Sequence, residues 1–207
     1  MTQLLAMHPI TPQLRLAKQV AAAIQADGVI VYPTDSGYAL GCRLTNKAGL
    51  DTIRQIRGLD EQHLFTLVCR DLSELATYAV VENPAFRLLK AHTPGPYTFI
   101  LKATNQVPRR LQHPKRKTIG LRIPDSKIAL AILDALKEPL ASMSLKLPNF
   151  DFPVMEAEVI CARLRGRVAL VVDGGPLPIT PTTVVELIER TPQVIRQGAG
   201  DPGPFLV

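Results

Sequence analysis

Residues 28–42, GVIVYPTDSGYALGC, place a cluster of small polar residues between two apolar runs. The first run stops at Pro33, and the second begins at Tyr38. Short apolar runs bounded by turn residues are typical of buried strands. In α/β sheets ligands collect where strands end, because backbone amides and helix N-termini are free there. The polar residues 33–36 are therefore a candidate binding element between two core strands.

Helical patterns lie on both sides of this pair of strands. One helix is expected between Thr11, as its N-cap before a first-turn proline, and Gly28, as its stop. Asn46 is expected to cap a second helix that Gly58 ends. Further helices are predicted to begin at Asp71, Asn83 and Asp125, and one more near residues 155–165. Strands are predicted at 65–69, 97–103, 118–124, 139–145, 168–175, 182–188 and 192–198.

Strands alternate with helices in some places and follow one another directly in others. This pattern predicts an α/β fold with a mixed sheet rather than a strictly parallel one. No repeat, low-complexity segment or linker divides the chain. We expect a single domain over residues 1–207, with a core at about 10–200.

The composition is that of an ordinary globular protein, with 46% hydrophobic and 20% charged residues. A net charge of +6 and an isoelectric point near 9.4 favour a phosphate-bearing or polyanionic partner, or equally a basic solvated surface. An aromatic content of 5% argues against a stacking platform for single-stranded bases. The sequence contains neither a signal-peptide pattern nor a membrane-spanning apolar stretch, so a cytoplasmic location and no membrane partner are expected.

Sequence motifs exclude several classes of site. The three cysteines form no CxxC pair, and the four histidines lack HxxxH or HExxH spacing, so no metal site made of protein side chains is expected. GxxxxGK[ST], a GxGxxG after a strand and GxSxG are absent. No residue is assigned a catalytic role from these patterns.

Polar residues follow several other predicted strands in the way that they follow the first. Ser and Thr hydroxyls and Arg guanidinium groups suit phosphate and carboxylate oxygens. Taken singly, such residues are usually turn residues or solvated charges. Five examples on one sheet favour an anion-binding face, and they lie at 33–36, Arg122, Ser142 to Lys146, 181–183 and 196–198.

Five separated motifs carry a family resemblance: VIVYPTDSGYALGC, PGPYTF, IGLRIP, PLASMS and the ending TTVVEL…VIRQG. In order and spacing they resemble the landmarks of the YrdC/YciO family over nearly the whole chain, most closely its YciO branch. The resemblance implies a twisted open mixed sheet with flanking helices around a basic concave surface. It also implies a nucleotidyltransferase, because relatives in this family are L-threonylcarbamoyladenylate synthases.

These synthases use ATP, L-threonine and bicarbonate, and they release pyrophosphate. The product serves the N6-threonylcarbamoyladenosine modification of tRNA position 37. Mg²⁺ would arrive with ATP, and a monomer or weak dimer is expected. The resemblance assigns threonine binding to Thr34, His63, Arg122, Ser142 and Thr182, and nucleotide binding to Arg57, Thr118, Ser144 and Arg196.

Three departures from the synthase pattern bear on activity. Where the synthases carry Lys-x-Arg, this chain has Arg57, Gly58 and Leu59, so the second cation is missing. Lys146 stands where the Ser-x-Ser-Ala-Asn motif has asparagine, and Asp35 stands where glutamate is common. The resemblance therefore leaves activity weak or altered.

A second hypothesis is an RNA-binding protein of the same fold without the chemistry. The segment 109–117, RRLQHPKRK, supports contacts to double-stranded RNA or tRNA, or is a solvated loop. Its candidate RNA contacts are Arg109, Arg110, Lys115, Arg116 and Lys117. A third hypothesis is a nucleotide-binding protein without turnover.

Overall fold

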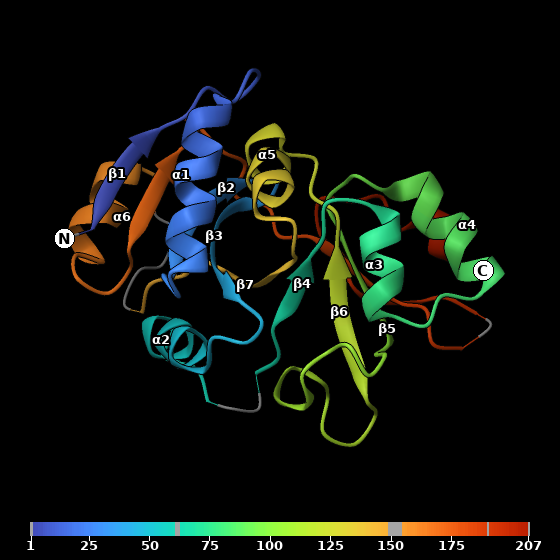
Figure 1. The fold of residues 1–207 in the computed structure, drawn as a ribbon. Helices are drawn as coiled ribbons and strands as arrows, with labels where there is room; N and C mark the ends of the chain where they lie inside the picture. Colours follow the sequence, from blue (N-terminus) through green and yellow to red (C-terminus); the bar gives the residue numbers. More distant parts are fainter. Residues whose placement is uncertain (1, 61–62, 149–154, 190, 207) are drawn as a thin grey trace.

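A computed structural model describes residues 2–60, 63–148, 155–189 and 191–206. Ten strands form one mixed sheet in the order β1-β8-β2-β3-β7-β4-β6-β5-β9-β10 (Figure 1). The strands are β1 (Gln3–Ala6), β2 (Ile30–Thr34), β3 (Gly37–Arg43), β4 (Thr66–Val68), β5 (Tyr97–Lys102), β6 (Thr118–Arg122), β7 (Leu140–Ser144), β8 (Leu170–Asp173), β9 (Thr183–Glu186) and β10 (Gln193–Arg196).

Parallel and antiparallel pairs are interspersed in this sheet. The pairs β1–β8, β2–β8, β4–β6 and β5–β9 are parallel, and the other five pairs are antiparallel. The prediction of a mixed α/β sheet is thus confirmed. Strand β1 was not predicted, because four residues at the chain start, with exposed or half-exposed side chains, carry little strand signal.

The helices cover the sheet from both sides. They are α1 (Leu14–Gln25), α2 (Lys47–Arg57), α3 (Leu72–Tyr78), α4 (Asn83–His92), α5 (Lys127–Leu136) and α6 (Ala157–Arg163). Single turns of 3₁₀ helix occur at Arg109–Leu111 and Gly203–Phe205.

Two hydrophobic cores result from this arrangement, one on each face. α1 and α5 pack against each other and against Ile30 and Tyr32 of β2. The larger core lies on the other face, where α2, α3, α4 and α6 contribute residues together with Val31 of the same strand. Since side chains alternate along a strand, the fully buried neighbours Ile30 and Val31 belong to different cores.

The helix ends test the predicted caps. The Asn46 side chain accepts a hydrogen bond from the Gly49 amide, and Asp71 caps α3 in the same way. Gly58 ends α2 in the left-handed conformation, with φ 62°. These three predictions are confirmed, since each residue type suits its position.

Three other predicted caps are wrong. Thr11 does not cap α1, which begins after Gln13, because the Thr11 hydroxyl lies 3.0 Å from the His8 ring nitrogen instead. α4 already includes Asn83, so Glu82 occupies its N-cap position. Asp125 does not cap α5, because its neighbour Ser126 accepts the hydrogen bond from the Ala129 amide.

No helix among the described residues is long and apolar enough to span a membrane.

The corrected α5 cap yields a stability test. The Ser126 hydroxyl also donates to the Pro33 carbonyl, so it links α5 to the turn after β2. We expect Ser126→Ala to lower the free energy of unfolding by about 1 kcal/mol, as the loss of an N-cap does. Asp125→Ala is the matched control, because Asp125 is exposed and contacts Asp35 through its backbone amide. Urea unfolding measures both variants, and a larger loss for Asp125→Ala would contradict the assignment.

Candidate functional site

A cavity of about 870 Å³ lies against the sheet and is lined by residues from eight of its strands. The alternation of side chains produces its floor. In β5, Thr98 and Ile100 line the cavity, while Phe99 belongs to the main core. In β4, Thr66 lines it and Leu67 belongs to that core. One face of these strands therefore carries small polar residues where a core would require apolar ones.

All nine residues assigned to threonine or nucleotide binding line this cavity. They come from positions 34 to 196 of the chain, and the sheet order brings them together. Counting all described lining residues, five are Lys or Arg, three of them among these nine, and none is Asp or Glu. The five cations are Arg57, Arg116, Arg122, Lys146 and Arg196. The composition of the cavity therefore favours anionic ligands.

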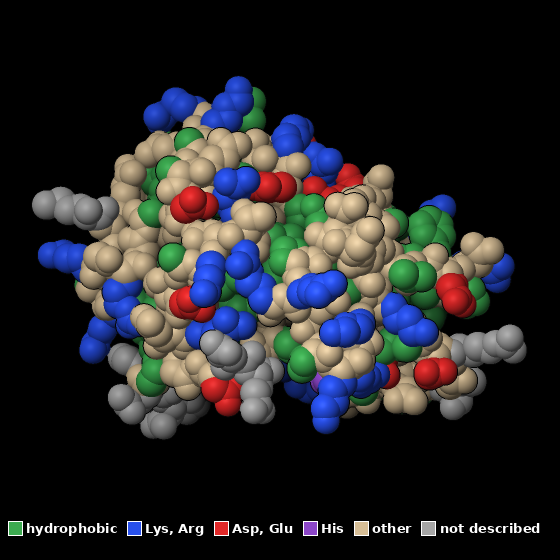
Figure 2. All heavy atoms as spheres, turned by 60° about the horizontal axis from the view of Figure 1, so that its bottom comes forward, with side chains coloured by type: hydrophobic (Ala, Val, Ile, Leu, Met, Phe, Trp, Pro, Cys, Tyr) green, Lys and Arg blue, Asp and Glu red, His purple; other side chains and the backbone are tan. Residues whose placement is uncertain are grey.

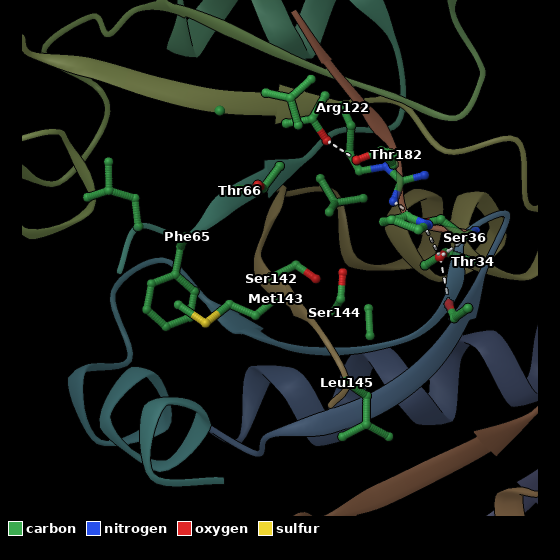
Figure 3. A pocket seen from close by; sticks show the side chains of 18 of the residues that line it. Thr34, Ser36, Phe65, Thr66, Arg122, Ser142, Met143, Ser144, Leu145 and Thr182 are labelled. Carbon is green, nitrogen blue, oxygen red and sulfur yellow. Dashed lines mark hydrogen bonds between the residues drawn. The ribbon is translucent and has the colours of Figure 1, made fainter. Parts of the chain in front are cut away.

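Arg122 is tied to the turn after β2, as Figure 3 shows. Its guanidinium donates to the Ser36 hydroxyl at 2.8 Å and forms an ion pair with Asp35. The second Asp35 oxygen accepts a hydrogen bond from the Asp125 amide at 3.1 Å. Arg122 is only 7% exposed, and it ties β6 to the turn after β2 in addition to lining the cavity.

The turn itself is fixed by Thr34. The Thr34 hydroxyl donates to the Gly37 carbonyl at 2.7 Å and accepts from the Ser36 amide at 3.1 Å. These bonds close the turn between β2 and β3 without any ligand. The Thr34 hydroxyl proton is therefore already used within the turn, and Thr34 offers a ligand its methyl group instead.

Ser142 lies above a buried tyrosine. Its hydroxyl donates to the Leu40 carbonyl, and the Tyr32 hydroxyl lies 2.8 Å from its oxygen. Burial raises the pKa of Tyr32 to about 12, so the phenol stays protonated at neutral pH. Because the single Ser142 proton goes to Leu40, Tyr32 donates and Ser142 accepts. Ser142 keeps one oxygen lone pair for a ligand.

Thr182 and Arg196 form the opposite side of the cavity. The Thr98 and Thr182 hydroxyls are 2.9 Å apart, and Figure 3 shows Thr182 beside Arg122. Arg196 donates to the Thr182 carbonyl at 2.8 Å and contacts its hydroxyl at 3.3 Å. This arginine is exposed, and its side-chain hydrogen bonds to the described residues go to neutral groups of Thr182, so its charge is available to a ligand.

A third group of polar residues lies around Arg57. Its guanidinium donates to the Ser144 carbonyl at 2.5 Å, and its partial burial lowers the pKa of this group below its ordinary value. Burial and the nearby Arg57 charge also lower the pKa of His63. Lys146 lines the cavity, whereas Leu59 packs against the main core and is not among the described lining residues.

The predicted RNA contacts divide into two groups. The Arg116 guanidinium pairs with Glu186 at 2.5 Å, and Arg110 donates to the Leu44 and Thr45 carbonyls. Arg109, Lys115 and Lys117 are exposed and have no hydrogen bond or ion pair through their side chains with the described residues. Figure 2 turns the lower side of Figure 1 forward, and Lys and Arg side chains gather on both halves of this face. Of the five residues, Arg116 alone lines the cavity.

The floor of the cavity was missed from the sequence. Tyr32, Thr66, Thr98 and Gly120 line it without having been predicted. A signal was present in YTFILK and TIGLR, where small polar or glycine residues alternate with large apolar ones. Such alternation marks one face that is not part of an apolar core.

The described residues include no group of three or more His, Cys, Asp or Glu side chains placed to hold a metal ion.

Fold and cavity together define an α/β protein with a polar, positively charged ligand cavity on one face of an open sheet. The Sua5/YciO/YrdC family model, described as "Telomere recombination", matches residues 22–198. The chain belongs to this family.

Relatives extend this result. The chain is 53% identical to YciO of Escherichia coli strain K12 and 55% identical to a Haemophilus influenzae protein, in both cases over all of both chains. It is 29% identical to the threonylcarbamoyl-AMP synthase of Bacillus subtilis, over 87% of this chain and 52% of that one.

Solved structures agree on the fold. The crystal structure of E. coli YciO gives a TM-score of 0.94 and covers all of both chains. P. abyssi Sua5 in complex with L-threonine gives 0.85 at 23% identity, over 95% of this chain and 58% of that one. At that identity the likeness to Sua5 shows the fold alone.

The buried ion pair of Arg122 leads to a second prediction. Arg122→Ala leaves the Asp35 carboxylate without its partner in a site where that side chain is only 12% exposed. We expect a loss of about 3 kcal/mol in the free energy of unfolding. Adding Asp35→Asn removes the uncompensated charge and should recover part of this loss.

Arg196→Ala serves as the control, because that side chain is exposed and bonded to neutral groups. Chemical denaturation of the four proteins measures the effect. Equal stability of Arg122→Ala and Arg196→Ala would show that the ion pair contributes nothing.

Proposed function

We propose that the protein is an L-threonylcarbamoyladenylate synthase or an enzyme closely similar to one. The observation that carries this proposal is the cavity itself. It brings together Ser and Thr hydroxyls and five cations from distant parts of the chain, and its lining includes every residue that the family resemblance assigns to threonine or ATP. The family membership and the synthase relatives support the same reaction.

The reaction needs positioning and charge stabilisation more than acid–base chemistry. The threonine amine and bicarbonate form a carbamate with loss of water. A carbamate oxygen then bonds to the α-phosphorus of ATP, and the bond to the pyrophosphate leaving group breaks. Negative charge increases on the phosphoryl oxygens, where Arg57, Lys146 and Arg196 would stabilise it. Holding the reactants in one cavity supplies much of the rate enhancement.

Mg²⁺ would enter this scheme as part of its substrate, MgATP. The described lining residues offer hydroxyls and cations but no carboxylates, which suits a metal ion carried by phosphate oxygens and water. Asp35, the acidic residue beside the cavity, already accepts from Arg122 and from the Asp125 amide. The cavity would therefore bind the nucleotide's phosphates and not the free ion.

Pyrophosphate release tests the proposal directly. The protein should release pyrophosphate from MgATP only when both L-threonine and bicarbonate are present. Ser142→Ala should raise the KM for threonine, since the Ser142 oxygen offers a lone pair to the cavity. We expect a loss of about 1 kcal/mol in threonine binding, roughly a fivefold rise. ATP affinity should change less.

The control is Ser73→Ala on α3, outside the cavity lining. Release of pyrophosphate that does not depend on threonine would point to another acceptor. No release at all, with ATP still bound, would leave a nucleotide-binding protein without this chemistry.

A second candidate function is RNA binding, favoured by the exposed side chains of Arg109, Lys115 and Lys117. Such contacts would be mainly electrostatic and largely independent of sequence. They would leave the cavity free for its own ligand, because these three residues do not line it.

The division of the basic loop predicts which charges matter. Reversal to Glu at Lys115 and Lys117 should weaken duplex RNA binding and reduce its salt dependence by roughly two released counterions. Reversal at Lys18 and Lys90, which are exposed on α1 and α4, is the matched control. Filter binding at several salt concentrations measures both. If both double reversals weakened RNA binding equally, the binding would depend on net charge alone and not on the loop 109–117.

A further inference from the structure

The cations that line the cavity differ in how far the protein neutralises them. Arg122 pairs with Asp35, and Arg116 pairs with Glu186. The carboxylates of Asp35 and Glu186 therefore neutralise much of the positive charge of these two arginines. Lys146, by contrast, has no side-chain hydrogen bond or ion pair with any residue that the structure describes.

Strand geometry places Lys146 on the cavity side. The backbone continues in extended form past the end of β7, since the Leu145 amide donates to the Tyr38 carbonyl at 2.8 Å. Leu145 is buried in the main core, while Ser144 and Lys146 on either side of it are exposed. Ser142, Ser144 and Lys146 all line the cavity, as do Met143 and Leu145 between them.

Arg57 reaches the same end of β7. Its guanidinium holds the Ser144 carbonyl, two residues before Lys146. Two residues of chain separate Cα atoms by at most about 7 Å, so the two cations border one part of the cavity. Arg57 bonds there to a neutral carbonyl and forms no ion pair with an acidic residue in the described part of the chain.

The position where the family resemblance expects a second cation cannot supply it. Leu59 is partly buried against the main core and, among the residues described, does not line the cavity. A second positive charge beside Arg57 is nevertheless present, and it comes from another strand. Relative to the synthase pattern, one cation is therefore lost at Leu59 and one is gained at Lys146.

We propose that Lys146 is a phosphate-binding residue which, with Arg57, holds the triphosphate chain of the nucleotide. A lysine ammonium suits this role, because it offers three donors on a flexible stem and acts as a point charge toward phosphate oxygens. The inference rests on the proposed function for the identity of the nucleotide. It assigns the phosphate end of that nucleotide to the Ser144 end of β7.

Calorimetric titration with MgATP tests this assignment on the full chain. Lys146→Met should weaken binding tenfold or more, as the loss of a charge-assisted hydrogen bond does. Lys146→Arg keeps the charge and should retain most of the affinity. Lys90→Met on α4 is the control, because it removes the same net charge from an exposed position outside the cavity. Binding of adenosine, which lacks phosphate, should be equal in all four proteins.

Further measurements separate this inference from the proposed function. An unchanged MgATP affinity in Lys146→Met, with pyrophosphate release intact in the unaltered protein, would overturn the role of Lys146 alone. Tripolyphosphate binding that depends on Lys146, without pyrophosphate release from threonine and bicarbonate, would support the phosphate site and overturn the synthase. If neither MgATP nor tripolyphosphate binds at low salt, both proposals fail. Melting temperatures of the variants show whether each is folded.

Discussion

The connection from β8 to β9 constrains the whole sheet. These strands are second and ninth in the strand order, so seven strand spacings separate them. At about 4.8 Å each, the path along a flat sheet would be roughly 34 Å. Residues 174–182 must cover it, and even ten fully extended steps reach only about 35 Å. The segment also turns at Gly175, with φ 79°, so it is not fully extended.

A flat sheet would leave this segment no slack, whereas bending the two halves toward each other shortens the distance it must cover. The segment 174–182 then crosses the concave face of the sheet, because a straight path between β8 and β9 is shorter than a path that follows the curved sheet. Ile179 and Pro181 of this segment line the cavity. The Pro178 carbonyl oxygen lies 3.2 Å from where a Cβ atom would stand if Gly37 were replaced by a larger residue. The short connection between β8 and β9 thus accounts for the curvature of the sheet, and it also forms part of the cavity wall. Helices α1 and α5 pack on one end of this face, and the remainder is left open to a ligand.

Sequence patterns predicted the local elements well and their assembly poorly. The caps at Asn46 and Asp71 and the stop at Gly58 follow from side-chain chemistry within one turn of chain, so they could be read directly. The errors at Thr11 and Asp125 arose because competing partners, the His8 ring and Ser126, lie only one to three residues away. Sheet order depends on contacts between distant residues, such as Gln3 and Leu170 in β1 and β8, and no local pattern encodes it.

The candidate site shows the same division between what is local and what is not. The family resemblance could place nine residues in a cavity, but it could not say which charges the protein itself would neutralise. The sequence alone does not distinguish Arg122 from Arg57. In the structure Arg122 pairs with Asp35, whereas Arg57 donates to a neutral carbonyl. The difference decides their roles. A buried arginine with a carboxylate partner is costly to remove, and it presents little net charge to a ligand. An arginine bonded to a carbonyl keeps its charge, and a nearby lysine with no partner among the described residues increases the local potential. We therefore expect affinity for an anion to be concentrated at the Ser144 end of β7, and the Asp35 end to hold the shape of the cavity.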